Sequence, residues 1–164
     1  VSGDNPSPMG SGVDNVAPSR AFLASDQKYV NISAPDQSTW ERLCKPLDLV
    51  HLLEDPRFTT NISRVQNRDE LDALIQSTVR QRPAQDWVDL LQKNQVPSGT
   101  YMIHNQVRIH PQVRELKMLT WIDSPWGELR VAGPPWNFSG TPASTKSPPL
   151  VGADTEDVIK SAGF

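Results

Sequence analysis

Three residues near the amino terminus combine backbone freedom with a hydroxyl group. Gly10, Ser11 and Gly12 follow one another in a stretch rich in proline, glycine and serine. Glycine lets a backbone approach a ligand closely and lets a loop move over it. The triplet is therefore a candidate substrate-covering loop, and the alternative is a flexible tail without a role in binding.

Asp36 is the second candidate. It stands directly before an apolar pattern typical of a helix, in which Trp40, Leu43 and Cys44 share one face. An aspartate in this place accepts a hydrogen bond from a backbone N–H of the first helical turn. The residues alone favour this N-cap interpretation, although an acid there could also donate a proton or orient a substrate.

The other reactive side chains do not match a known catalytic or metal-binding spacing. Cys44 is the only cysteine, so it forms neither an internal disulfide nor a cysteine metal site. His51, His104 and His110 lack the i, i+4 spacing of a helical zinc pair. Ser98 precedes a glycine but lies in no Gly-x-Ser-x-Gly motif, which indicates a turn. We therefore predict no metal site.

The arginines of the central part have two interpretations. Arg57 lies in the run Asp-Pro-Arg-Phe and is expected to bind loop carbonyls or a carboxylate, while Phe58 enters the core. Arg64 and Arg68 could bind phosphate groups, but nearby acidic residues favour ion pairs across helix turns. These acidic residues are Asp69, Glu70 and Asp72. The five tryptophans are expected to anchor the core: Trp40, Trp87, Trp121, Trp126 and Trp136.

Composition narrows the classes of function. The chain has 164 residues, 16 basic residues and a net charge of −3. Because the basic residues are scattered, nucleic acid is not an expected partner. The apolar runs are too short for a membrane-spanning helix, and no signal peptide is recognised. We expect a cytoplasmic protein and, because the chain opens with Val1, part of a longer polypeptide.

The first two thirds of the chain predict a hairpin followed by helices. β-prone runs at 20–25 and 28–33 flank a two-residue polar turn. Helices are expected from Asp36 to about Cys44, over about 47–53, from Asn67 to about Arg82, and from Pro83 to about 94. A short strand over 100–103 follows a turn.

The last third predicts a second hairpin and a final helix. A short helix over 107–115 is interrupted by Pro111, and strands are expected at 116–122 and 128–132. Residues 137–152 are expected to be extended, and Asp154 to cap a helix over 155–162 that Gly163 ends. Because strand pairs and helices are grouped rather than alternating, the fold class is α+β.

The order of these pieces resembles the class III coenzyme A transferases, the CaiB/BaiF family. The similar segments are residues 18–22, 25–30, 40–44, 55–58, 64, 67–71, 86–87, 96–99, 110–113, 133–142 and 149–163. The resemblance covers about residues 9–164. Ser19 replaces the tyrosine that is usual in the family and Gln27 replaces a glycine, which affects local turn geometry.

The resemblance implies an architecture. Family members pair a large Rossmann-like domain with a small α+β domain, and two chains interlock as a homodimer. This chain is expected to hold a loop or linker at 1–18, the small domain at 19–132, made of β-hairpins packed with short helices, and a carboxy-terminal segment at 133–164 that returns to the large domain.

The resemblance also implies an activity. Family members move coenzyme A between carboxylic acids, and the transferases use an aspartate that forms a mixed anhydride and then an aspartyl-CoA thioester. That aspartate lies in the amino-terminal half of the family, so no catalytic residue is assigned here and the chain alone is expected to be inactive. The expected ligands are acyl-CoA and a small carboxylate, with coenzyme A as a substrate rather than a cofactor.

The same resemblance gives the candidate residues more specific roles. Gly10, Ser11 and Gly12 lie where some transferases carry a glycine-rich loop over the active site. Racemases of the family place an acidic side chain near the position of Asp36, and this side chain reaches into the partner subunit's site. The alternatives that stay open are an acyl-CoA racemase and a stand-alone dimerisation or ligand-binding domain without catalysis.

Overall fold

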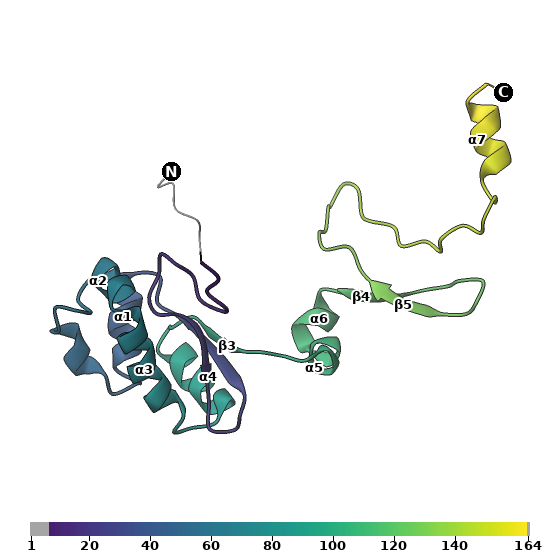
Figure 1. Cartoon of the computed structure of the whole chain (residues 1–164). Helices are drawn as coiled ribbons and strands as arrows, with labels where there is room; N and C mark the ends of the chain where they lie inside the picture. Colours follow the sequence, from purple (N-terminus) through teal and green to yellow (C-terminus); the bar gives the residue numbers. More distant parts are fainter. Residues whose placement is uncertain (1–6, 164) are drawn as a thin grey trace. The chain divides into compact units, whose positions relative to one another are not determined.

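A computed structural model describes residues 7–163. The chain divides into two compact units, one through Tyr101 and one from Met102 (Figure 1). The boundary between the two units, at 101/102, does not coincide with the segment boundary expected at 132/133. That boundary concerns a longer protein and stays a prediction.

The first unit contains an antiparallel sheet of three strands. β1 (Ser19–Leu23) pairs with β2 (Tyr29–Ser33), and β2 pairs with β3 (Ser98–Thr100), so β2 is central. The expected hairpin is confirmed. The third strand was expected over 100–103 but is formed by Ser98–Thr100, because its register sets Gly99 opposite Asn31 of β2. Residues 101–103 are exposed.

Five helical segments lie between β2 and β3 in the sequence. They are α1 (Gln37–Cys44), the single 3-10 turn η1 (Val50–Leu53), α2 (Asn61–Gln66), α3 (Arg68–Val79) and α4 (Ala84–Lys93). The helix expected over 47–53 is only the η1 turn. Helix α2 was not predicted because its apolar residues are few, and it begins at a capping box in which Thr60 and Ser63 bind each other's backbone N–H groups.

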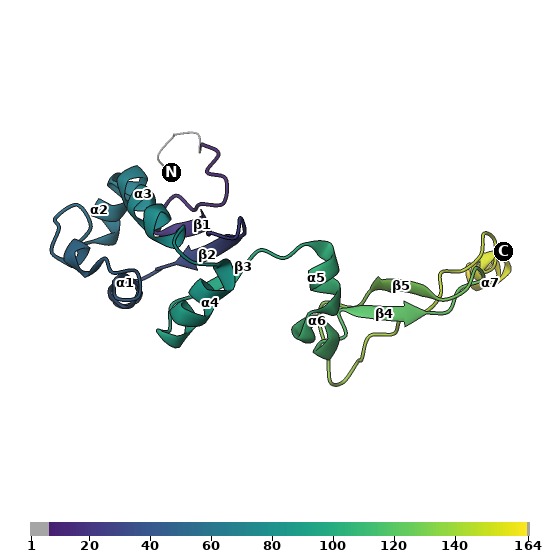
Figure 2. The same cartoon turned by 90° about the horizontal axis from the view of Figure 1, so that it is seen from below.

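Helices α3 and α4 pack against the sheet and form the core with it (Figures 1 and 2). Phe22, Val30 and Ile32 alternate onto the covered face, as the two-residue period of a strand requires. Trp40 and Trp87 are buried among them, which confirms these two as core anchors. The Trp87 Nε1–H donates to the Val79 carbonyl at 2.8 Å, so its one polar atom is satisfied inside the core.

The second unit contains helices α5 (His104–Ile109) and α6 (Pro111–Glu115), the hairpin of β4 (Leu119–Ile122) and β5 (Leu129–Ala132), and helix α7 (Thr155–Ser161). The hairpin and the break at Pro111 are confirmed. Asp154 stands at the N-cap of α7, but its side chain makes no capping hydrogen bond, because its backbone is not in the extended conformation that aims the carboxylate at the first turn.

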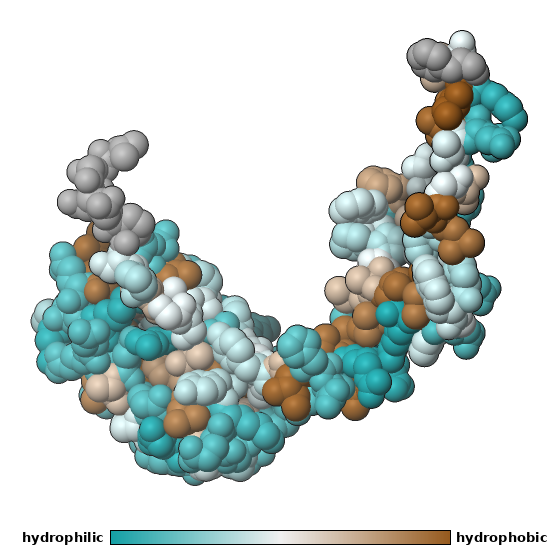
Figure 3. Space-filling model, turned by 45° about the vertical axis from the view of Figure 1, so that its right-hand side comes forward, coloured by the Kyte–Doolittle hydropathy of each residue, from teal (hydrophilic) through white to brown (hydrophobic). Residues whose placement is uncertain are grey.

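None of the described residues of the second unit is fully buried. The expectation that Trp121, Trp126 and Trp136 anchor a core is therefore wrong for this chain, since their exposures are 60%, 73% and 59%. A hairpin of two strands cannot enclose such rings by itself. Apolar side chains therefore lie on the surface of this unit, where Figure 3 shows them in brown.

No helix within residues 7–163 has both the length and the apolar character needed to cross a membrane. This finding agrees with the short apolar runs of the sequence.

Arg57 binds carboxylates and so holds the loop, as expected. Its guanidinium binds Asp55 at 2.6 Å and also binds Glu70 of α3, while the Phe58 ring enters the core. The hydrogen bonds from the Arg57 side chain and backbone lower the pKa of Asp55 to about 2. This carboxylate therefore contributes stability above its unfolded pKa near 4, and the contribution is lost as the pH falls through about 2.

We expect an Asp55→Asn variant to be less stable than the parent chain at pH 6. The difference in melting temperature should narrow steadily between pH 4 and pH 2, because the parent carboxyl takes up its proton in that range. Thermal unfolding followed by circular dichroism at matched pH values measures both curves. A gap that stays constant from pH 6 to pH 2 would contradict the assignment.

Candidate functional site

The glycine triplet forms a tight turn before β1. Gly10 has a φ of +60°, in the left-handed region that favours glycine. The Gly12 N–H donates to the Met9 carbonyl at 3.0 Å, and a Cβ on Gly12 would lie 3.2 Å from that same oxygen. Gly10 thus suits the turn by its left-handed backbone, and Gly12 by its close approach to the Met9 oxygen.

Ser11 fixes this turn on the free edge of the sheet. Its Oγ accepts a hydrogen bond from the Ala21 N–H at 3.1 Å. Two residues further along β1, the Gln76 side chain binds both the N–H and the carbonyl of Leu23, at 2.9 and 2.8 Å. Ser11 and Gln76 therefore bind three backbone groups at the outer edge of β1 to which a fourth strand could otherwise pair.

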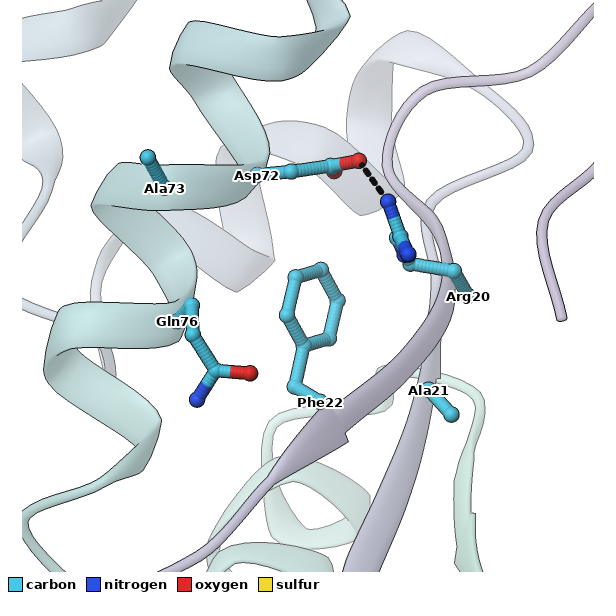
Figure 4. Close-up of a pocket in the computed structure, with 6 residues that line it drawn as sticks. All are labelled: Arg20, Ala21, Phe22, Asp72, Ala73 and Gln76. Carbon is cyan, nitrogen blue, oxygen red and sulfur yellow. Dashed lines mark hydrogen bonds and ion pairs between the residues drawn. The ribbon is translucent and has the colours of Figure 1, made fainter. Parts of the chain in front are cut away.

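A pocket lies between β1 and α3 next to the Ser11 contact (Figure 4). Its lining residues are Arg20, Ala21, Phe22, Asp72, Ala73 and Gln76. Arg20 Nη1 donates to Asp72 Oδ2 at 2.7 Å. Burial raises the pKa of Asp72, and the Arg20 guanidinium opposes that shift. Within the pocket the Gln76 amide is already bound to Leu23 and Asp72 Oδ2 to Arg20, whereas Asp72 Oδ1 and Arg20 Nε are buried without a partner among the described residues.

The opposite face of the sheet is exposed and carries small or uncharged residues. Ala21, Asn31 and Gly99 lie side by side across the three strands. The hydroxyls of Ser19 and Ser33 lie 3.1 Å apart on one side of this row. On the other side, the rings of Tyr29 and Tyr101 meet edge to face at 6.4 Å. A shallow pocket on this face is lined by Asn31, Ser33, Pro97, Ser98, Gly99, Thr100 and Tyr101, none of which is charged. We call it the uncharged trough.

Asp36 is the N-cap of α1. Its Oδ1 accepts from the Thr39 N–H and from the Ser38 hydroxyl, both at 2.8 Å. The Thr39 backbone bond is the main reason why the pKa of Asp36 is lowered. The capping interpretation is confirmed. Asp36 does not line the pocket beside Ser11, and the structure does not test the role that the racemases suggest.

Arg64 is a buried structural residue whose role the sequence interpretation assigned wrongly. Both of its expected roles, phosphate binding and ion pairing, are excluded by its complete burial among carbonyls. Helix α2, which the sequence pattern did not reveal, turns this side chain inward. Its guanidinium also lies 5.0 Å from the Trp40 ring. Arg68, the second of the pair, donates to the Asp14 carbonyl at 2.8 Å and likewise makes no carboxylate pair in the described chain.

The described residues hold no cluster of three or more His, Cys, Asp or Glu side chains that could bind a metal ion. His110 Nδ1 instead accepts the Gln112 N–H at the start of α6. Cys44 is buried, and burial raises the pKa of its thiol to about 12. It is therefore not an activated nucleophile.

The small antiparallel sheet with helices packed on one of its faces makes the first unit an α+β domain. The family model of CoA-transferase family III matches residues 1–155. The chain belongs to this family, and the resemblance read from the sequence is confirmed.

The relatives agree with this assignment. The chain is 30% identical over 156 residues to an acyl-CoA transferase of Fusarium pseudograminearum, covering 92% of this chain and 34% of that protein. It is 28% identical over 148 residues to the succinyl-CoA:glutarate CoA-transferase of Homo sapiens, covering 89% of this chain and 34% of that protein. The chain thus spans about a third of the length of the curated relatives it matches.

Solved structures share the fold. The crystal structure of Rv3272 from Mycobacterium tuberculosis has a TM-score of 0.77 at 28% identity, covering 88% of this chain and 40% of that one. A CAIB/BAIF family protein from Brucella suis has a TM-score of 0.72 at 29% identity, covering 98% of this chain and 41% of that one. The mixed α+β fold with antiparallel sheets is therefore that of class III CoA-transferase structures.

Proposed function

We propose that this chain supplies the small domain of an enzyme that moves coenzyme A between carboxylic acids through acyl-CoA thioesters. The family match over residues 1–155 carries the proposal, because it contains both the glycine turn and the sheet that holds it. Relatives named for transfer of coenzyme A to glutarate and to oxalate support the same chemistry. Acyl-CoA and a small carboxylate are the proposed ligands.

Two features of the first unit support specific roles in this reaction. The turn Gly10–Ser11–Gly12 exposes backbone that carries no side chain at its two glycines, which suits contact with a thioester. The uncharged trough around Asn31 is proposed as one face of the acyl pocket, because its hydroxyl and amide groups match a short polar acyl chain better than a long apolar one.

The nucleophile is proposed to lie outside this chain. The family resemblance assigns it to an aspartate of the amino-terminal part, and the chain spans only about a third of its curated relatives. In the longer protein, residues 19–132 would form the small domain and residues 133–164 would return to the large domain. An interlocked homodimer is the proposed assembly.

A stand-alone binding domain is less well supported. Such a domain is expected to be polar wherever a relative's other domain would cover it. Instead, Trp121, Trp126 and Phe138 are 57–73% exposed. Exposed apolar groups of this number usually mark an interface.

The test measures coenzyme A transfer. We expect the 164-residue chain alone to form no new acyl-CoA from succinyl-CoA and glutarate, because the nucleophilic aspartate is proposed to lie outside it. The same chain extended by the amino-terminal two thirds that its relatives have should form glutaryl-CoA, detected by chromatography. Transfer by the short chain, or a folded extended protein inactive with every carboxylate in a panel of mono- and dicarboxylates, would overturn the proposal.

A further inference from the structure

The segment that connects the glycine turn to β1 is bound by side chains from the helices. Asn61 of α2 binds it twice: its Nδ2 donates to the Asn15 carbonyl at 2.8 Å, and its Oδ1 accepts the Ala17 N–H at 3.2 Å. These partners are 44 and 46 residues apart in the sequence. The contacts are therefore tertiary and not part of a local turn.

Two arginines extend the same attachment. Arg64 Nε donates to the Ala17 carbonyl at 2.7 Å inside the core, and Arg68 Nη2 donates to the Asp14 carbonyl at 2.8 Å. Backbone groups of Asp14, Asn15 and Ala17 are thus held by three side chains of α2 and α3. We call Asn61, Arg64 and Arg68 the backbone clamp.

The glycine turn itself is held much more weakly. Gly10 and Ser11 are exposed, and a Cβ added to Gly10 would meet nothing within 4 Å. Outside the turn's own Gly12–Met9 bond, the hydrogen bond from the Ala21 N–H to Ser11 Oγ is the one that ties residues 9–12 to β1 within the described part of the chain. The tip of this loop, residues 9–12, is therefore weakly held, whereas residues 14–17 are firmly held.

We propose that the backbone clamp positions the glycine turn, and that Ser11 is a releasable latch between the turn and β1. Ordering a backbone residue costs conformational entropy, which a single exposed hydrogen bond barely offsets. The clamp orders residues 14–17 in advance, so the tip can close on the sheet edge at a small entropic cost. Without the clamp, the Ser11 bond would form only part of the time.

This arrangement would let the turn open for acyl-CoA and close again without disturbing the core. The assignment of acyl-CoA as the occupant rests on the proposed function. The mechanical coupling between clamp and latch does not, because it concerns only hydrogen bonds within this chain.

Hydrogen exchange of the purified chain tests the coupling directly. The Ala21 N–H reports the latch and the Ala17 N–H reports the clamp. We expect Arg68→Ala and Asn61→Ala to raise exchange at Ala21 by about fivefold to tenfold, although neither side chain touches it. Ser11→Ala should raise exchange at Ala21 and leave Ala17 unchanged.

The controls separate positioning from loss of structure. Arg80→Ala removes an exposed arginine at the end of α3 and should change neither amide. Arg68→Lys keeps a donor and should restore much of the protection at Ala21. Protection of Ile75 in the core must stay unchanged in every variant. Unchanged exchange at Ala21 in both clamp variants would overturn the proposal.

The extended protein supplies a second readout. If the closed turn binds acyl-CoA, reducing its population raises the apparent dissociation constant by the same factor. Arg68→Ala should then raise KM for acyl-CoA by about fivefold while kcat changes little, and Arg68→Lys should reverse the change. A fall in kcat at constant KM would contradict this role. A protein that transfers no coenzyme A would refute the proposed function and leave the exchange result valid.

Discussion

Replacing Arg64 by alanine should lower the free energy of unfolding of the first unit by about 3 kcal/mol. The guanidinium is fully buried and donates to the carbonyls of Ala17 and Phe58 and to the Gln37 side chain. Removing it leaves two core carbonyls without a donor, each costing about 1–3 kcal/mol, and opens a cavity. Burial lowers the pKa of Arg64, so relief from burying its charge offsets part of the loss.

Urea unfolding followed by circular dichroism measures the change. Arg64→Lys should be destabilised almost as much, because one ammonium group cannot reach acceptors spread around a planar guanidinium. Arg80→Ala, at an exposed site, should stay within about 0.5 kcal/mol of the parent. A loss below about 1 kcal/mol in Arg64→Ala would show that these hydrogen bonds have little net value.

Arg64 also shows why part of the site could not be predicted from sequence. Periodicity identifies helices by their apolar residues, and α2 has few of them. Its start depends on hydroxyl groups at Thr60 and Ser63 that bind the backbone reciprocally. Once α2 forms, Arg64 points inward, away from the acids five to eight residues later in the sequence. The ion pairs that seemed natural from spacing therefore do not form.

Local features of the site were predictable. Asp36 was recognised as an N-cap because the capping bond spans three residues. Gly10 and Gly12 were recognisable as turn residues, and the structure gives both a geometric reason. The partner of Ser11, by contrast, lies ten residues away on β1. The side chains of α2 and α3 that bind residues 14–17 lie further still along the sequence. No sequence pattern encodes such pairings in a single chain.

The fold, like the site, has elements that the sequence predicts and elements that it does not. The hairpin of β1 and β2 and helices α1, α3 and α4 follow from local turn and helix signals. β3 was placed two residues too late because its register depends on β2, which lies about seventy residues earlier. The apolar pattern at 100–103 indicated a strand, yet these residues follow the paired segment.

The second prediction with a large effect concerns Trp87. We expect Trp87→Ala to lower the free energy of unfolding by about 4 kcal/mol, the usual cost of truncating a large buried aromatic side chain. Trp87 is 2% exposed, and its ring lies beneath the Arg82 guanidinium at 5.2 Å. Trp87→Phe should lose less, about 1–2 kcal/mol, because the ring volume is partly kept while the Val79 carbonyl loses its donor.

Trp126 supplies the matched comparison, because the same residue type is 73% exposed there. Trp126→Ala should change the unfolding of the 164-residue chain by no more than about 0.5 kcal/mol. In the extended protein, the proposed function predicts that this ring is covered, so the same substitution should then cost at least about 1 kcal/mol. Equal small effects in both proteins would argue against a covering surface. A large effect in the short chain would show that the second unit has a core of its own.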